Sequence, residues 1–333
     1  MADRPVRIWA VSDGRAGMES QALGLAEAVA RLRPAEVFVK RVAYRPRIGR
    51  LPSLLNLFPR RSLAPVSDRI EPPWPEVWIA AGRATLPLSV RVRRWSGGRT
   101  FVVQTQAPRL PLGLFDLVIA PRHDRLVGDN VFSITGSPNR LTPHRLEADR
   151  ARFARLIDPL PEPRVAVLIG GRSRRFDLSP ARAEALAGEL GAALDGLGGA
   201  GLMMTFSRRT PQRAKTILQA RLGARPGLVW DGAGDNPYFA FLAAADYVAV
   251  TEDSTNMAAE AAGTGKPVFV LKMDGGSERM RRFHEDLELR GAARPFGGAF
   301  YGWSYPPLHE TERAAEEVVR RLQGRLALPT PRD

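Results

Sequence analysis

Residues 251–271 read TEDSTNMAAEAAGTGKPVFVL, and this stretch decides the fold of the second half of the chain. The apolar run DYVAV before it and the run PVFVL at its end predict two strands, and the small residues between them predict a helix. Asp253 or Ser254 can cap that helix, whose first backbone N–H groups have no partner within the helix. Because the helix dipole is positive at this end, the turn at 251–254 is suited to binding a phosphate.

Glu260 lies in the second turn of the predicted helix. At that depth its carboxylate is expected to reach the sugar of a ligand rather than the phosphates. An ordinary strand–helix–strand unit with a good cap has the same pattern, so the neighbouring loops are needed to decide between the two interpretations.

Both halves of the chain alternate short apolar runs with helical patterns. This alternation predicts parallel sheets covered by helices on both faces. We therefore expect two Rossmann-like, doubly wound α/β domains that face each other across a cleft. The predicted strands are 6–11, 36–42, 77–81, 101–104, 117–120 and 131–135 in the first half, and 165–169, 201–206, 228–230, 246–250 and 267–271 in the second.

The segment DPLPEPR at 158–164 contains three prolines in seven residues, which predicts an interdomain linker. We therefore expect a first domain over 1–157 and a second domain over 158–308. Residues 309–333 predict a C-terminal helix that packs back toward the first domain.

The composition is that of an ordinary globular protein, with 44% hydrophobic and 25% charged residues among 333. No apolar run approaches the roughly 20 residues that span a bilayer, and the start of the chain has no signal-peptide pattern, so a cytoplasmic protein is expected. With no Cys, and four His at no metal-ligand spacing, neither disulfides nor a metal site is predicted.

The net charge of +14 favours anionic partners. Only four of the 49 basic residues are Lys, and such an Arg bias is typical of GC-rich genomes.

Three further loops of the second half follow predicted strands, and the carboxyl ends of parallel strands share one edge of a sheet. Glycine in the first loop lets backbone approach a ligand closely, and Arg in the second binds paired phosphate oxygens. Each loop also has a structural alternative: a common glycine turn, a solvated Arg pair, or a simple helix cap. Together the loops favour a diphosphate site made of Gly170, Gly171, Ser173, Ser207, Arg208, Arg209, Asn236, Asp253, Ser254 and Glu260.

The loops of the first half are less specific. The sequence SDGRAG at 12–17 follows the first strand but lacks the GxGxxG spacing, and no acidic residue closes a second strand, so NAD is not expected. Asp13 is a candidate base, and His123 beside Asp124 is another, because a neighbouring carboxylate tunes a histidine. A lone His is, however, more often structural. The other residues expected on this side are Ser12, Gly14, Gln21 and Asn139.

The segment from Lys40 to Ser67 contains no Asp or Glu, and Leu and Phe residues are interleaved with its basic ones. This pattern predicts docking on an anionic membrane face. Nucleic-acid binding is not expected, because the apolar residues are mostly aliphatic rather than stacking aromatics. An insertion packed on its own domain is the structural alternative. The seven basic residues are Lys40, Arg41, Arg45, Arg47, Arg50, Arg60 and Arg61.

In chain order, SDGRAGMESQALGLAEA, PRHD, TGSPNRLTP, GGRS, FSRRTP and TEDSTNMAAEAAGTGKPVFVL resemble the mitochondrial-fission Elm family, whose bacterial members are often labelled predicted nucleoside-diphosphate-sugar epimerases. The resemblance covers residues 6–305. The second half is also similar to the donor-binding domain of GT-B glycosyltransferases, including the lipid-linked enzyme of peptidoglycan synthesis. This similarity implies that Gly170-Gly171 and Asp253-Ser254 hold a diphosphate and that Glu260 binds ribose hydroxyls.

The loop at Asp13 departs from the GGxGGH form of the lipid-linked enzymes, so it defines neither the acceptor nor the base. We expect a GT-B-type glycosyltransferase with a nucleotide-diphosphate sugar as substrate, no cofactor or metal, and a cell-envelope or lipid-linked acceptor. The first domain would be the acceptor side and the second the nucleotide-sugar-binding side, peripheral at the inner face of the membrane. Two alternatives stay open: a non-catalytic, membrane-associated scaffold of the Elm family, and a nucleotide-sugar 2-epimerase with the same two-domain fold.

Overall fold

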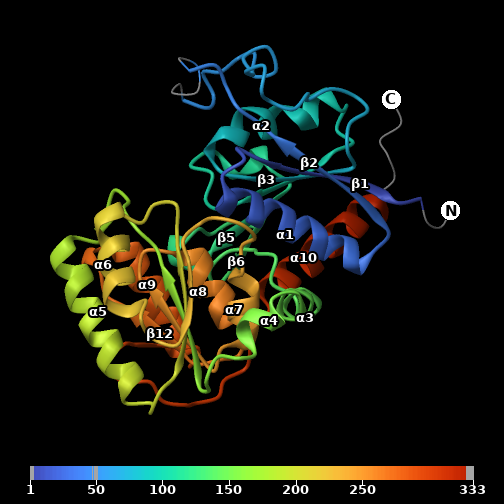
Figure 1. Ribbon diagram of the computed structural model, residues 1–333. Coiled ribbons are helices and arrows are strands. Elements are labelled where there is room, and N and C mark those ends of the chain that lie inside the picture. The colour runs from blue at the N-terminus through green and yellow to red at the C-terminus, as the bar shows by residue number, and fades with distance from the viewer. Residues whose placement is uncertain (1–3, 47, 49–51, 328–333) are drawn as a thin grey trace. The chain divides into compact units, whose positions relative to one another are not determined.

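The computed structural model describes residues 4–46, 48 and 52–327, and the chain divides into two compact units. Unit 1 comprises Met1–Arg140 and His309–Asp333, and unit 2 comprises Leu141–Leu308. Each unit contains one six-stranded parallel sheet with helices packed against it (Figure 1). The predicted fold class, α/β with two doubly wound sheets, is confirmed.

The sheet of unit 1 has the strand order β2-β1-β3-β4-β5-β6. The chain runs from β1 outward to β2 and then crosses back to β3 on the other side of β1. The strands are β1 (Val6–Ser12), β2 (Ala35–Arg41), β3 (Val77–Ala81), β4 (Phe101–Thr105), β5 (Leu117–Pro121) and β6 (Val131–Ile134). The helices are α1 (Ala16–Leu32), α2 (Leu86–Trp95) and α10 (Glu310–Ala327), with short 3-10 turns at Arg83–Thr85, Leu112–Leu114 and Arg122–Asp124.

The inner strands β3, β4 and β5 are buried along their whole length, as expected for a sheet covered on both faces. Side chains of β1 alternate between the two faces. Ile8 packs in one apolar cluster with Leu25 of α1, and Trp9 packs in the other with Leu88 of α2. The apolar residues of this sheet therefore supply two cores, one on each face.

The C-terminal helix α10 belongs to unit 1, although it is the last element of the chain. It lies beside α1 (Figure 1), and its apolar stripe is buried in the same cluster as Leu25 and Val29 of α1. The buried residues of this stripe are Ala314, Ala315, Val318 and Leu322.

The sheet of unit 2 has the strand order β10-β9-β7-β11-β12-β14, with a separate β13-β8 pair. The strands are β7 (Arg164–Ile169), β8 (Phe176–Asp177), β9 (Gly201–Phe206), β10 (Gly227–Trp230), β11 (Tyr247–Thr251), β12 (Val268–Leu271), β13 (Asp274–Gly275) and β14 (Ala293–Pro295). The helices are α3 (Pro143–Arg152), α4 (Ala154–Ile157), α5 (Pro180–Asp195), α6 (Gln212–Leu222), α7 (Tyr238–Ala244), α8 (Thr255–Ala262) and α9 (Glu278–Leu289).

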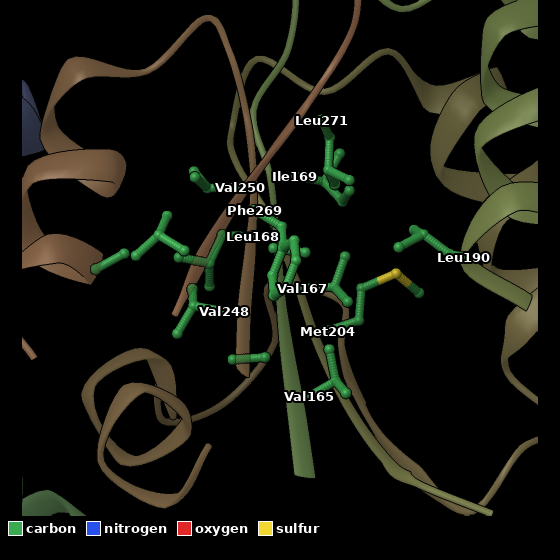
Figure 2. Close-up of a cluster of buried hydrophobic side chains, with 14 of the residues drawn as sticks. Val165, Val167, Leu168, Ile169, Leu190, Met204, Val248, Val250, Phe269 and Leu271 are labelled. Atoms are coloured by element: carbon green, nitrogen blue, oxygen red, sulfur yellow. The ribbon is translucent and has the colours of Figure 1, made fainter. Parts of the chain in front are cut away.

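The core of unit 2 surrounds β7 and β11 (Figure 2), where Val167 and Val250 are fully buried. Phe269 of β12 is also fully buried and meets the rings of Phe300 and Trp303 edge-on, with centroids 5.1 Å away in both cases. This packing fixes the ends of β7, β11 and β12, from which the polar loops of the unit extend.

The boundary between the units differs from the predicted one. The units divide after Arg140, whereas the sequence predicted a division after residue 157. The reason is packing: Leu146 of α3 contacts the core of unit 2, and Phe153 and Ile157 are part of it. The proline-rich segment 158–164 therefore lies within unit 2, and its interpretation as an interdomain linker was wrong.

None of the helices in the described part of the chain combines the length and the apolar character that a bilayer span requires.

Candidate functional site

The topology of unit 2 singles out one place on its sheet. From β7 the chain builds outward through β9 and β10, then crosses back so that β11 pairs with the other side of β7. Ligands of open parallel sheets bind at such a switch point, beyond the carboxyl ends of the two strands. The loops that meet there are the glycine turn after β7 and the turn after β11, both of which the sequence predicted to hold a diphosphate.

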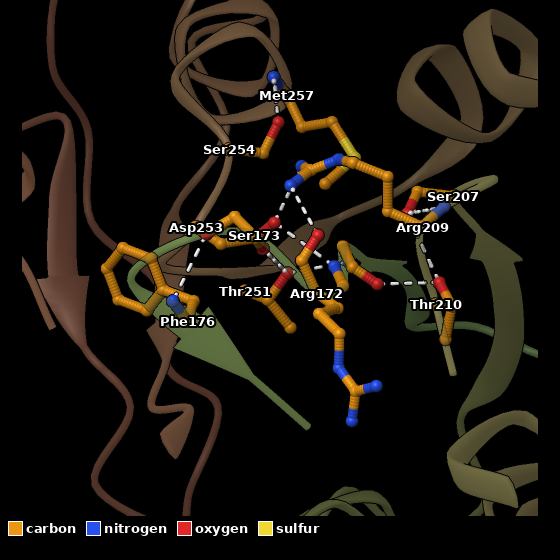
Figure 3. A network of polar contacts seen from close by, with 12 residues as sticks. Arg172, Ser173, Phe176, Ser207, Arg209, Thr210, Thr251, Asp253, Ser254 and Met257 are labelled. Atoms are coloured by element: carbon orange, nitrogen blue, oxygen red, sulfur yellow. Dashed lines mark hydrogen bonds and ion pairs between the residues drawn. The ribbon is translucent and has the colours of Figure 1, made fainter. Parts of the chain in front are cut away.

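Asp253 joins these two loops (Figure 3). Its side chain has no solvent exposure, and its Oδ1 accepts a hydrogen bond of 2.8 Å from the Thr251 hydroxyl. Its Oδ2 accepts from the Gly171 N–H at 3.1 Å and from the Arg209 guanidinium at 2.7 Å. The Thr251 hydroxyl oxygen in turn accepts from the Gly170 N–H at 2.7 Å. The carboxylate is thus fully engaged, and it positions other groups at the crevice.

The two glycines are required by close approach of neighbouring protein groups. A Cβ at Gly170 would overlap the Asp253 carboxylate, and a Cβ at Gly171 would overlap the backbone of Arg209. From the sequence, we expected these glycines to let a ligand approach the backbone closely. In the structure, the neighbouring loops fill the space that the missing side chains leave.

Arg209 is the group of this network that remains accessible, with 46% of its side chain exposed. Its backbone is held by the Ser207 hydroxyl, which accepts from the Arg209 N–H at 3.1 Å, and by the Arg172 N–H, which donates to its carbonyl at 2.9 Å. A guanidinium has five N–H donors. Asp253 accepts from Nη2 of Arg209 at 2.7 Å, and the Arg172 carbonyl accepts from its Nη1 at 3.4 Å, so donors remain for a further anion. Arg208 is exposed on the same loop.

The remaining loop residues mainly hydrogen-bond to nearby backbone, and one of them, Ser254, caps a helix. Ser254 caps α8 by accepting from the Met257 N–H at 3.3 Å, as predicted. Ser173 accepts from the N–H groups of Arg175 and Phe176, which closes its own turn. Asn236 is exposed, and its side-chain oxygen accepts from the Tyr238 N–H at 3.0 Å. Ser173 and Asn236 therefore use these oxygens to hold backbone.

Glu260 lies on α8 but is only 7% exposed. Its Oε2 accepts a hydrogen bond of 2.7 Å from the Tyr238 hydroxyl. Burial raises the pKa of the Glu260 carboxyl to about 7, against the opposing effects of the Tyr238 hydrogen bond and the Arg145 charge. The guanidinium of Arg145 lies over the ring of Phe239, 4.1 Å from its centroid. The sequence predicted Glu260 as a sugar ligand but could not show that Tyr238 holds it.

Unit 1 has a switch point of its own, between β1 and β3. Ser12 is buried and accepts from the Gly14 N–H at 3.1 Å, and Gly14 adopts a φ of +73° that favours glycine. Asp13 accepts from Arg15 Nε at 2.7 Å, and this bond raises the pKa of the Arg15 guanidinium. Asp13 therefore lies at the predicted edge as an ion-paired carboxylate with 14% of its side chain exposed.

The other candidates of unit 1 lie inside the fold. Gln21 is buried, and its side-chain oxygen accepts from Gln106 at 2.9 Å. His123 is also buried, and its Nε2 lies 3.9 Å from Asp124 Oδ1, which is too long for a hydrogen bond. The Asn139 backbone N–H donates to Thr311 at the start of α10. The structure brings Ser12, Asp13 and Gly14 together and places the other residues in packed positions.

Over residues 4–46, 48 and 52–327, no group of three or more His, Asp or Glu side chains could hold a metal ion.

The structure has the fold of nucleotide-sugar enzymes of the GT-B group. The UDP-GlcNAc 2-epimerase of Methanocaldococcus jannaschii superposes with a TM-score of 0.56 at 12% identity, over 96% of this chain and 99% of that one. The UDP-GlcNAc 2-epimerase of Neisseria meningitidis bound to UDP-GlcNAc superposes with a TM-score of 0.52 at 12% identity, over 96% of this chain and 100% of that one. At such identities the similarity concerns the fold alone.

The sequence places the chain in a particular family. The family model described as mitochondrial fission ELM1 matches residues 16–322, so the chain belongs to this family, as the motifs predicted. The mitochondrial fission protein ELM1 of Arabidopsis thaliana is 32% identical over 278 residues, which are 75% of this chain and 65% of the plant protein. The match thus spans less than two thirds of that relative's length.

Proposed function

We propose that the chain is a glycosyltransferase that binds a nucleoside-diphosphate sugar in unit 2. The observation that carries this proposal is the ion pair at the switch point, where the buried Asp253 holds the partly exposed Arg209 next to the capped start of α8. A guanidinium and the free N–H groups of a helix start are suited to a diphosphate. A fold shared with an enzyme that was solved with UDP-GlcNAc bound supports the same ligand class.

In this proposal the diphosphate is the leaving group of the transfer. Negative charge grows on its oxygens as the bond to the sugar breaks, and fixed donors stabilise that charge without having to reorganise. Arg209, with Arg208 beside it, would supply the positive charge, and the N–H groups of α8 would supply the dipole. This arrangement stabilises the leaving group without requiring a metal ion.

Glu260 is proposed as the ribose ligand. Because its Oε2 already accepts from Tyr238, ribose hydroxyls would donate to the remaining lone pairs of the carboxylate. The acceptor is proposed to be a cell-envelope or lipid-linked molecule, with Asp13 as the group that accepts its proton. His123 and Asp124 are weaker candidates, because the His123 side chain is only 1% exposed.

The first experiment is a thermal-shift panel with the UDP, GDP, CMP and dTDP sugars. A ligand at 100 times its dissociation constant stabilises the folded state by about 2.7 kcal/mol, which shifts the melting temperature measurably. The proposal expects one of the three nucleoside-diphosphate series, UDP, GDP or dTDP, to stabilise the protein more than the CMP sugars, which carry a single phosphate. A flat response from folded protein would contradict it and would favour the scaffold alternative.

The reaction itself is tested with the donor that binds. Incubation with cell-envelope lipids should release the nucleoside diphosphate and label an acceptor. Conversion of the free nucleotide sugar into its 2-epimer, with no acceptor present, would instead identify the epimerase alternative.

A specific observation in unit 1 also supports membrane docking. Leu55, Leu57 and Phe58 are 63–66% exposed, and they lie in the basic segment from Lys40 to Ser67, of which Arg47 and Arg50 fall outside the described residues. A hollow of about 940 Å³ borders the segment and is lined by more arginines than carboxylates. Exposed apolar side chains beside cations fit an anionic lipid surface. The arginines of the hollow are Arg60, Arg61, Arg69, Arg91 and Arg94.

Co-sedimentation with phosphatidylserine-containing vesicles tests this docking. The double variant Leu57→Ser, Phe58→Ser should reduce binding, and added salt should reduce binding of the unmodified protein. Val127→Ser is the matched control, because Val127 is an exposed apolar residue of the same unit outside the segment. Equal loss of binding in the control would argue against docking through this surface.

A further inference from the structure

A pocket lies on the same edge of the unit 2 sheet as the proposed diphosphate site. It has a volume of about 470 Å³ and is formed where β11, β12 and β14 end, beside α9. Its walls include Phe176, Glu252, Lys272 and Ser277, with His284 of α9 among them. No motif in the sequence indicated this pocket, because its residues come from four separate segments.

His284 is the most distinctive group of the pocket. It is 7% exposed, and its Nε2 lies 2.9 Å from the backbone carbonyl oxygen of Glu252. Because a carbonyl oxygen only accepts, Nε2 must carry the proton, and Nδ1 is then the acceptor of the neutral ring. Burial lowers the pKa of His284, which favours this neutral form.

The Nδ1 atom of His284 is buried and has no hydrogen-bond partner among the described residues. A buried acceptor without a donor costs free energy, so such an atom calls for a ligand or a water. His284 also lines the pocket, so a donor for Nδ1 would have to approach from there.

The charges of the lining define what kind of donor fits. Four carboxylates line the pocket, against two cations, Lys272 and Arg281, in a chain whose net charge is +14. Glu252 is occupied, since it accepts from Lys272 at 3.1 Å and from the Met273 N–H at 2.7 Å. Two of the remaining carboxylates, Glu278 and Glu285, pair with Arg281. The lining nevertheless holds more carboxylates than cations, which suits a ligand with hydroxyl donors and does not suit a phosphate. The carboxylates besides Glu252 are Glu278, Glu285 and Glu288.

The pocket and the proposed diphosphate site are built from neighbouring residues of the chain. Glu252, whose carbonyl holds His284, directly precedes Asp253 of the crevice. Phe176 donates its backbone N–H to the Ser173 hydroxyl (Figure 3), and Ser173 lies on the loop that begins with Gly170 and Gly171. One pair of loops therefore borders both the anion-binding and the hydroxyl-binding parts of the edge.

We infer that this pocket receives the sugar of the nucleotide sugar and that His284 Nδ1 accepts a hydrogen bond from one of its hydroxyl groups. The inference rests on the proposed function, since the diphosphate must bind in the adjoining crevice. His284 is then a specificity-determining residue, because the fixed acceptor favours sugars that present a hydroxyl at the matching position.

The test compares each nucleoside diphosphate with its sugar conjugate by calorimetry: UDP with UDP-GlcNAc, GDP with GDP-mannose, and dTDP with dTDP-glucose. His284→Gln keeps an N–H that can donate to the Glu252 carbonyl but removes the Nδ1 acceptor. We expect the preferred sugar conjugate to bind the unmodified protein about tenfold more tightly than the diphosphate alone, and this increment to fall to about twofold in His284→Gln. Binding of the diphosphate alone should be unchanged.

Two further variants make the outcome specific. His144→Gln is the matched control, because His144 is an exposed histidine of the same unit, and it should keep the full increment. His284→Asn places an acceptor near the Nδ1 position and should restore part of the affinity that the sugar adds to the diphosphate. If the unmodified protein binds sugar conjugate and diphosphate equally, or if His284→Gln keeps the increment, the inference is wrong while the proposed function stands. If no nucleotide binds, both are wrong.

Discussion

Glu260 is buried, which costs folding stability when its carboxyl ionises, and we propose that the same side chain binds the ligand. In the folded chain its pKa is about 7 because of burial, compared with an ordinary value of 4.5. Between these two pH values the folded state binds more protons than the unfolded state, so stability falls as pH rises through this window. The pKa difference corresponds to about 3 kcal/mol once the carboxyl is ionised in both states.

Glu260→Gln should therefore gain stability relative to the unmodified protein as pH rises from 4.5 to 7, by up to about 3 kcal/mol. The amide oxygen can still accept from Tyr238, so the variant should fold. Hydrogen exchange of the slowest amides of the unit 2 sheet, at pH 5 and pH 8, measures the difference. If the difference in stability between Glu260→Gln and the unmodified protein is the same at pH 5 and pH 8, Glu260 ionises in the folded state as it does in water.

Arg209 carries the electrostatic part of the proposed site. Arg209→Gln should weaken nucleotide binding about tenfold or more, because hydrogen bonds to charged groups are worth roughly 1.5–3 kcal/mol. Isothermal titration below the melting temperature of both proteins gives the comparison. Arg213→Gln, an exposed Arg at the start of α6, is the control and should bind normally. Equal affinity of Arg209→Gln and the unmodified protein would remove Arg209 from the site.

At the scale of elements, the β7 and β11 turns depend on each other. The Gly170 turn is shaped by the carboxylate of Asp253, which lies 83 positions later in the sequence. The Gly-Gly pair predicted a turn correctly, but its neighbours in space come from the loops after β9 and β11 rather than from the adjacent sequence. The reason for the glycines could therefore not be derived from the local pattern.

Gly170→Ala should destabilise unit 2 by roughly 2–4 kcal/mol, since the added methyl group must displace a buried, hydrogen-bonded carboxylate. Gly188→Ala is the matched control: Gly188 lies in α5, and an added Cβ meets no atom within 4 Å. The control should stabilise the helix by up to about 1 kcal/mol. Thermal unfolding of the two variants gives the comparison, and a Gly170→Ala protein as stable as the unmodified one would contradict the model of this turn.

At the scale of the whole molecule, the chain returns to its first unit at its end. The stripe of α10 is buried against α1, and Val318 is fully buried there. Val318→Asp places an unpaired charge in this cluster and should cost several kcal/mol in unit 1. Hydrogen exchange should show faster exchange in β1 and β3, while β7 and β11 keep their protection. Glu316→Ala on the exposed side of α10 is the control, and equal loss of protection in both sheets would argue against two separate cores.

The sequence by itself determined the class of fold, the main strands and the family, because buried parallel strands are continuous apolar runs and helix caps are local signals. It also predicted that Asp253, Ser254 and Arg209 lie in loops at one edge of a sheet, because these loops follow neighbouring parallel strands. Only the tertiary structure decided the boundary at Arg140, the burial of Glu260 against Tyr238, and the pocket around His284. These features depend on side chains that packing brings together from distant segments, and no local pattern in the sequence specifies such contacts.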